Sequence, residues 1–392
     1  MRHPARHHPA RMPDLPDFTW IDRPEQLAEV AAVLDTAPWI ALDTESNSMF
    51  VYRERMCLLQ LNAGGRLFAL DTLALTGPPG DGPSTALEAL RPTLERTDRI
   101  LYLHGGEYDC AVLRRDFAIR LGGVWDSQQA AQLLGWERTG YGASVETVCG
   151  VILDKAYTQY DWGIRPLDPN ALIYALDDVV HLPKVGEHLH ELIKQADLEE
   201  EMSIACHAVI DAPWGGGFDP GGFWRIKGVR ELPSHCLGVL AALWTWRDGV
   251  ARVQDRPPGR ILNGEALLAV ARAAPTNFQL LKRTGMKGWI LSEHGEELVE
   301  LIKVARTDPP ALPPRPKHRE VTKEEEDRET RMKDWRRVEA QQRNVPLMVV
   351  LPAKALEYLK QHGAGQLEAA PQLGPKRLAR YGDKLRDLCA AR

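Results

Sequence analysis

The periodicity of apolar residues changes near residue 200, and this change constrains the fold more than any other feature of the chain. Before it, short β-type runs alternate with helical patterns. The expected strands are 39–43, 57–61, 67–70 and 100–103, and the expected helices are 107–116, 127–135, 144–151 and 169–195. Strand hairpins followed by strands that alternate with helices predict an α/β domain, a mixed sheet covered by helices.

After residue 200 the strand pattern ends, and the apolar residues recur at helical spacing. A proline-rich stretch interrupts this helical half at 308–316, and it is too stiff to pack as a helix. Trp244 to Asp248 and Trp335 to Arg337 each precede a turn with proline and an apolar helix, which indicates a diverged duplication. The predicted domains are a disordered tail at 1–15, the α/β domain at 16–203, helical domains at 204–305 and 322–392, and a linker at 306–321.

Size, charge and cysteine content exclude several classes of protein. A chain of 392 residues is long enough for two or three domains. Its formal net charge of −5 excludes a protein that coats nucleic acid by charge alone, although a local basic patch remains open. No apolar run is long enough to span a bilayer, and six dispersed cysteines without a Cys-x-x-Cys pair favour reduced thiols in the cytoplasm.

Asp43 and Glu45 lie two residues apart on an expected apolar strand, so their side chains leave the same face. Ionised carboxylates on such a strand are costly unless a cation neutralises them. A strand that simply ends in solvent is the alternative, and Asp-x-Glu alone does not exclude it.

Two further acidic positions follow in the chain. Asp109 comes after an apolar strand and the sequence His104-Gly-Gly, although it could equally be an ordinary residue at the start of a helix. Tyr174 and Asp178 are four residues apart on an expected helix and share one face. Oxygen ligands of this kind suit Mg²⁺ or Mn²⁺, whose usual role is phosphate chemistry.

In this order, 42–45, 103–109 and 174–178 resemble the three motifs of the DEDD 3′–5′ exonucleases, and the tyrosine resembles their tyrosine subgroup. The stretches 153–155 and 161–167 resemble the ribonuclease D family and its relative in the eukaryotic exosome. The two helical segments resemble the helicase-and-RNase-D C-terminal (HRDC) domain. The resemblance implies a ribonuclease H-like sheet followed by two HRDC-like bundles.

The resemblance also implies a mechanism with two divalent cations about 4 Å apart. Asp43 would bridge both, Glu45 and Asp178 would hold the cation that carries the attacking water, and Asp109 would support the second. Tyr174 would position that water. Attack on the last phosphodiester would release a nucleoside 5′-monophosphate from the single-stranded 3′ end of an RNA, such as a tRNA precursor.

Other residues are candidates for substrate contact. His104, Tyr108 and Trp162 could touch the terminal nucleotides, although each could equally be structural. Residues 374–392 carry a net charge of +4, and this basic patch could bind phosphates or merely be a solvated helix face. Its members considered for RNA contact are Lys376, Arg377 and Arg380.

The sequence is compatible with two alternatives to an exoribonuclease. One is a DNA 3′–5′ exonuclease, because no residue of the sequence identifies a contact to a 2′-hydroxyl. The other is an RNA-binding module whose catalytic site is silent, which is disfavoured because all five motif residues are present.

Overall fold

The computed structural model of the protein describes residues 16–78, 80, 82–315 and 319–390. The tail expected at 1–15 lies outside these residues. The described chain forms two units, one of 16–45, 56–78, 80, 82–213 and 324–390 and the other of 46–55, 214–315 and 319–323. No helix among the described residues is long and apolar enough to cross a membrane.

The first unit contains a mixed sheet of six strands in the order β1-β4-β3-β2-β5-β6. The strands are β1 (Phe18–Ile21), β2 (Trp39–Ser46), β3 (Met56–Ala63), β4 (Arg66–Leu70), β5 (Ile100–Leu103) and β6 (Val124–Asp126). β3 and β4 are antiparallel, whereas β1 with β4, β2 with β5 and β5 with β6 are parallel. The mixed sheet predicted from the sequence is therefore confirmed, and β1 and β6 are strands that the apolar pattern did not predict.

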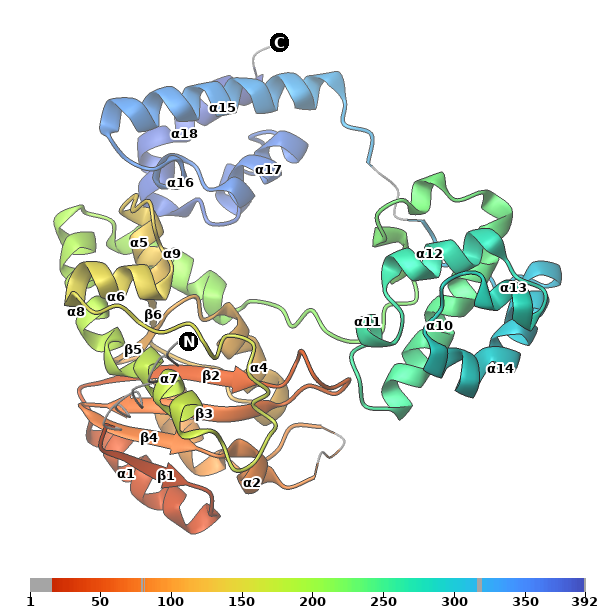
Figure 1. The fold of residues 1–392 in the computed structure, drawn as a ribbon. Helices are drawn as coiled ribbons and strands as arrows, with labels where there is room; N and C mark the ends of the chain where they lie inside the picture. The colour runs from red at the N-terminus through yellow and green to blue at the C-terminus, as the bar shows by residue number, and fades with distance from the viewer. Residues whose placement is uncertain (1–15, 79, 81, 316–318, 391–392) are drawn as a thin grey trace, which may run out of the picture. The chain divides into compact units, whose positions relative to one another are not determined.

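The helices of this α/β domain pack on both faces of the sheet (Figure 1). They are α1 (Leu27–Thr36), α2 (Thr72–Thr76), α3 (Arg91–Leu94), α4 (Glu107–Phe117), α5 (Ser127–Leu133), α6 (Tyr141–Cys149), α7 (Pro169–Val180), α8 (Leu182–Gln195) and α9 (Glu199–Ile210). Every residue of β3 is buried, since this strand lies between neighbours and beneath helices. Because β2 lies between β3 and β5, the residues at its C-terminal end lie near the middle of the sheet, away from the edge strands β1 and β6.

The domain boundary expected at residue 203 is wrong, because it falls inside α9. Met202 and Cys206 of this helix are buried in the hydrophobic cluster of the α/β domain. The first unit continues to Pro213 before the chain enters the second.

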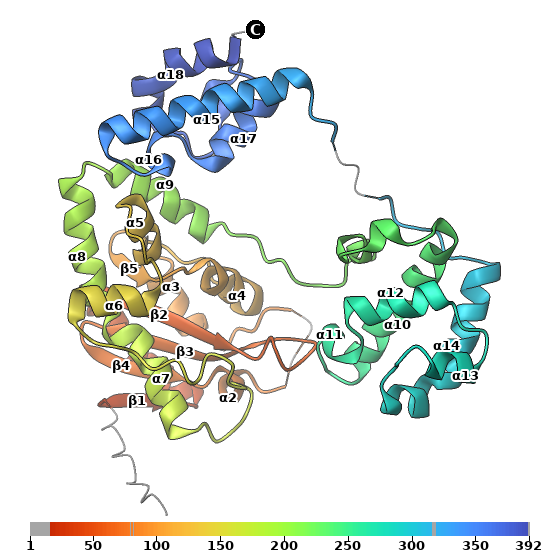
Figure 2. The same cartoon turned by 45° about the horizontal axis from the view of Figure 1, so that its top comes forward.

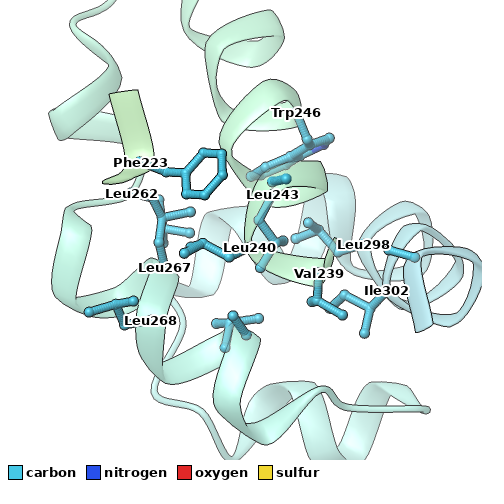
Figure 3. Packing of buried hydrophobic residues seen from close by; sticks show 14 of the residues in the cluster. Phe223, Val239, Leu240, Leu243, Trp246, Leu262, Leu267, Leu268, Leu298 and Ile302 are labelled. Atoms are coloured by element: carbon cyan, nitrogen blue, oxygen red, sulfur yellow. The ribbon is translucent and has the colours of Figure 1, made fainter. Parts of the chain in front are cut away.

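The second unit is a helical bundle, called here the first helical domain. Its helices are α10 (Leu237–Val253), α11 (Pro258–Ile261), α12 (Gly264–Ala273), α13 (Phe278–Lys282) and α14 (Gly288–Thr307). Figure 3 shows how Phe223 packs with Leu240, Leu243 and Leu262 in the core of this bundle. The loop 46–55, which follows β2, belongs to the same unit.

A second helical domain lies within the first unit. It comprises α15 (Lys323–Arg343), α16 (Leu347–Val350), α17 (Ala353–His362) and α18 (Gly374–Ala390), all drawn in blue in Figure 2. Its own core includes Met332, Leu359 and Leu385. Val349 instead joins the hydrophobic cluster of the α/β domain, so the two domains share buried apolar surface.

Replacement of Phe223 by Ala tests the core of the first helical domain. Phe223 is fully buried and contacts the rings of Trp224 and Trp244. Removal of such a side chain should lower the free energy of unfolding by about 3–5 kcal/mol. Urea denaturation followed by tryptophan fluorescence measures the change. Val253→Ala is the control, because this side chain is 85% exposed and its loss should cost under about 0.5 kcal/mol.

Candidate active site

Asp43 and Glu45 lie in the C-terminal half of β2, and their side chains leave the same face of the sheet. Ile40, Ala41 and Leu42 before them are buried, which fixes the register of the strand. The expectation that the two carboxylates lie on one side of the strand is confirmed, since both reach the same cluster.

Helix α7 carries Tyr174 and Asp178. Asp168 caps the helix by accepting a hydrogen bond from the Asn170 amide at 2.8 Å, and Pro169 occupies the first helical position. Ala175 and Val179 are buried on the face that packs against the sheet. The shared face expected from the spacing of Tyr174 and Asp178 is confirmed, since Asp178 reaches Asp43 and Glu45 and the charges of the same carboxylates act on the Tyr174 phenol.

Asp43, Glu45 and Asp178 form a cluster of carboxylates. One carboxylate oxygen from each lies within 4.8 Å of those of the others. No other group of three potential metal ligands of this kind occurs among the residues that the structure describes. Three convergent oxygens with partial access to solvent fit a hard divalent cation.

Asp109 lies near the cluster and is held there by residues that the sequence did not indicate. The Thr44 hydroxyl donates to its carboxylate at 2.5 Å. The carboxylate of Asp126 is fully buried and accepts from the Gly106 amide at 2.8 Å, at the start of the helix that carries Asp109. Position 106 requires glycine, since a Cβ there would lie 2.6 Å from the side chain of Leu103.

Burial and mutual repulsion raise the pKa of every carboxylate at this site. Burial is the larger cause for Asp43 and Glu45, whose pKa values are also raised by neighbouring charges that include Asp178. Burial and then the charges of Asp177 and Asp109 raise the pKa of Asp178 to about 7. Burial raises the pKa of Asp109 to about 6 against the opposing hydrogen bond from Thr44. A bound cation would relieve this repulsion.

Tyr174 lies beside these carboxylates and keeps its proton at neutral pH. Burial, and then the charge of Asp178, raises the pKa of Tyr174 to about 12. Its ring packs against Trp162 and Tyr157, with centroid distances of 6.4 and 6.2 Å. The phenol is therefore a neutral group that can donate a hydrogen bond to a water or to a phosphate oxygen.

Arg165 anchors the segment that leads into α7. Its guanidinium forms two hydrogen bonds with the buried carboxylate of Asp71, at 2.6 and 2.8 Å, and also donates to the Cys57 carbonyl at 2.7 Å. It donates as well to the carbonyls of Trp162 and Ile164. The motif at 161–167 thus has a structural role, because its arginine fixes the chain just before the helix that carries Tyr174 and Asp178.

The expected nucleotide contacts differ in their surroundings. Tyr108 is 38% exposed near the start of α4 and is accessible to a substrate. Trp162 is only 3% exposed, so a direct contact with a base is not supported. His104 is partly exposed, and its Nδ1 lies 2.8 Å from the Ser127 hydroxyl. Burial lowers the pKa of His104 to about 4, so the ring is neutral.

The basic patch expected near the C-terminus is mostly engaged within the protein. Arg377 is 3% exposed and donates to the backbone carbonyls of Val349 and Met348, so the expectation that it contacts RNA is wrong. Lys376 forms an ion pair with Asp197 at 2.9 Å and approaches Glu201 at 3.6 Å. Arg380 alone of the three is exposed, and its contact with RNA stays a prediction.

Both the α/β domain and the first helical domain are similar to known protein families. Residues 18–194 match the family model of a 3′-5′ exonuclease, and residues 237–302 match that of the HRDC domain.

Ribonuclease D proteins are among the relatives. That of Granulibacter bethesdensis is 30% identical over 317 residues, covering 78% of this chain and 76% of the relative. That of Gluconacetobacter diazotrophicus is 29% identical over 303 residues, covering 76% and 75%. The crystal structure of Escherichia coli RNase D, an exoribonuclease involved in structured RNA processing, is similar in fold. Its TM-score is 0.70 at 24% identity, with 95% of this chain and 98% of that chain covered.

The response of stability to pH and to metal tests the electrostatics of the cluster. The raised pKa values of Asp109, about 6, and Asp178, about 7, mean that the folded, metal-free protein holds protons that the unfolded chain releases between about pH 4 and pH 7. The contribution of these carboxylates to the stability of the folded, metal-free protein should therefore fall as pH rises through this window. Mg²⁺ should raise the melting temperature more at about pH 8 than at about pH 5.5, because protons compete with the cation.

Thermal melts of the Asp178→Asn protein provide the comparison. This variant should lose most of the Mg²⁺-dependent increase and be more stable than the wild type without metal at about pH 8. Glu107→Gln, which removes an exposed carboxylate from the first turn of α4, should keep the wild-type response. An equal gain from Mg²⁺ at both pH values would contradict the assignment.

Proposed function

The chain belongs to the ribonuclease D family and is a metal-dependent 3′–5′ exoribonuclease, and we propose that it acts on RNAs with single-stranded 3′ ends. The observation that carries the proposed site is the convergence of Asp43, Glu45 and Asp178 within 4.8 Å. We further propose that two cations, Mg²⁺ or Mn²⁺, bind there. A cytoplasmic location stays a prediction.

The donor set fits such cations, because three carboxylates with raised pKa values gain most from a positive charge between them. Divalent cations bound at a site of this kind lower the pKa of water and stabilise negative charge on the phosphate. Asp43 and Glu45 would hold them from the strand and Asp178 from the helix. Asp109, fixed by Thr44, would complete the ligand set.

Tyr174 would orient the attacking water toward the last phosphodiester. Its high pKa makes it a donor of a hydrogen bond rather than a base, so the proton of the water must pass to another acceptor. Cleavage at this bond would release a nucleoside 5′-monophosphate. The exposed ring of Tyr108 is the best placed of the expected aromatic residues to stack on a base near the site.

RNA as the preferred substrate distinguishes this proposal from a DNA exonuclease. Matched single-stranded RNA and DNA oligonucleotides, digested under the same conditions, provide the test. Faster digestion of DNA would contradict the proposal. A silent RNA-binding module is disfavoured by the geometry, since the carboxylates and Tyr174 lie at one edge of the sheet.

We propose tRNA precursors as the physiological class of substrate, by analogy with the family. A time course on tRNA with an extended 3′ end, with Mg²⁺, Mn²⁺ or EDTA, tests the reaction, the polarity and the cofactor together. Stepwise shortening from the 3′ end with either metal and none in EDTA is the expected result. Cleavage that starts at the 5′ end or within the chain would contradict it.

Two substitutions separate cation binding from orientation of the water. Asp43→Asn should lower the rate of RNA hydrolysis by about a thousandfold or more, because a ligand of the cations loses its charge. Tyr174→Phe should lower kcat by about a hundredfold and leave the Mg²⁺-dependent stabilisation intact. Single-turnover hydrolysis of a labelled oligonucleotide measures both rates.

Tyr157→Phe is the matched control for Tyr174, because its ring lies beside that of Tyr174 while its hydroxyl lies near Asp168 and Asn170. It should retain the wild-type rate within about threefold. An Asp43→Asn protein that hydrolyses RNA at the wild-type rate would refute the assignment of the site.

A further inference from the structure

The two helical domains repeat one another in the order and spacing of the elements that follow Trp246 and Trp335. A spacing of 89 residues separates Trp246 from Trp335 and Pro257 from Pro346. Each of these prolines caps the N-terminus of a single-turn helix, α11 in the first copy and α16 in the second. The same arrangement then continues with a ten-residue helix, α12 and α17 respectively. The duplication expected from the sequence thus extends through the bundles.

The correspondence includes the turn with which the last long helix of each copy begins, just before α14 in the first copy and at the first residues of α18 in the second. Gly285 and Gly374 are again 89 residues apart, and their φ angles of 77° and 76° are both left-handed. Lys287 and Lys376 follow them at the same distance, at the beginning of α14 and α18. These two helices have 20 and 17 residues, long enough for their N-terminal amides to attract an anion.

In the second copy this turn binds carboxylates. The backbone amide of Lys376 donates to the Glu200 carboxylate at 2.8 Å, and the ammonium group pairs with Asp197 at 2.9 Å. A Cβ on Gly374 would lie 2.6 Å from the same Glu200 oxygen, so only glycine allows this close approach. The turn is therefore an anion-binding element, and here it attaches the second helical domain to α9.

In the first copy the same turn is open. Within the described structure nothing lies within 4 Å of the Cβ position of Gly285, and no side chain caps α14. Lys282, Arg283 and Lys287 are exposed, and none of them forms an ion pair with any described residue. Lys287 donates to the Arg260 carbonyl, which leaves two of its three N–H donors. Residues 276–292 contain these three cations and no carboxylate.

We propose that the start of α14, with Lys282, Arg283 and Lys287, binds backbone phosphates of the RNA substrate. This inference rests on the proposed RNA substrate. A phosphate suits the site better than a single carboxylate, because three exposed cations lie within six residues of the sequence here, whereas the second copy uses one lysine. Because the net charge of the chain is −5, electrostatic attraction to RNA phosphates has to come from local basic surfaces such as this one.

Charge reversal of the three residues in the full chain provides the test. The affinity of the Lys282→Glu, Arg283→Glu, Lys287→Glu protein for a fluorescent single-stranded RNA is measured by anisotropy in EDTA, across a series of KCl concentrations. Loss of three phosphate contacts should lower the affinity about tenfold or more. It should also reduce the slope of log K against log salt by about 2.

The control reverses three cations of the same unit that lie outside the turn, Lys227→Glu, Arg230→Glu and Lys303→Glu. It should retain the wild-type slope. The neutral triple variant Lys282→Gln, Arg283→Gln, Lys287→Gln should show the same reduction in slope if charge reversal prevents folding. An unchanged slope in the triple variants, or an equal reduction in the control, would overturn the inference.

Failure of this inference is distinguishable from failure of the proposed function. Hydrolysis of RNA by the wild-type protein with Mg²⁺ tests the function and does not depend on the turn. Active protein whose RNA affinity is insensitive to the triple substitution would refute only the phosphate site.

Discussion

The electrostatic conflict among carboxylates at one edge of the sheet is the constraint on which the functional account depends. Burial and mutual repulsion raise the pKa values of Asp43, Glu45, Asp109 and Asp178 together, which is costly in a metal-free protein. The fold tolerates the conflict because β2, α4 and α7 are held by extensive apolar packing elsewhere. A bound pair of cations would remove this repulsion. The same carboxylates that destabilise the metal-free protein would therefore favour binding of the cations that the reaction needs.

Residues around the site hold this arrangement without belonging to it. Thr44, Asp126 and Arg165 each connect backbone or carboxylate groups that are distant in sequence. The duplicated helical domains show a related division of roles. The turn at Gly374 attaches one copy to the α/β domain, whereas the turn at Gly285 remains open to an anion. One local structure thus serves two kinds of contact.

The parts that followed from local rules could be predicted. Asp43 and Glu45 share a face because strands have a period of two, and Tyr174 and Asp178 share one because helices have a period of 3.6. Contacts between distant segments could not be predicted. The bond from Thr44 to Asp109 spans 65 positions, and the bond from Lys376 to Glu200 spans 176. For the same reason the charge of Arg377 predicted a solvent-exposed side chain, although its guanidinium donates hydrogen bonds to backbone carbonyls inside the protein.

The most direct measurement is a crystal structure of the protein soaked in Mn²⁺, with anomalous diffraction used to locate the metal. The account predicts anomalous peaks within coordination distance of the carboxylate oxygens of Asp43, Glu45 and Asp178. Anomalous peaks found only elsewhere, with these three carboxylates unligated, would contradict it.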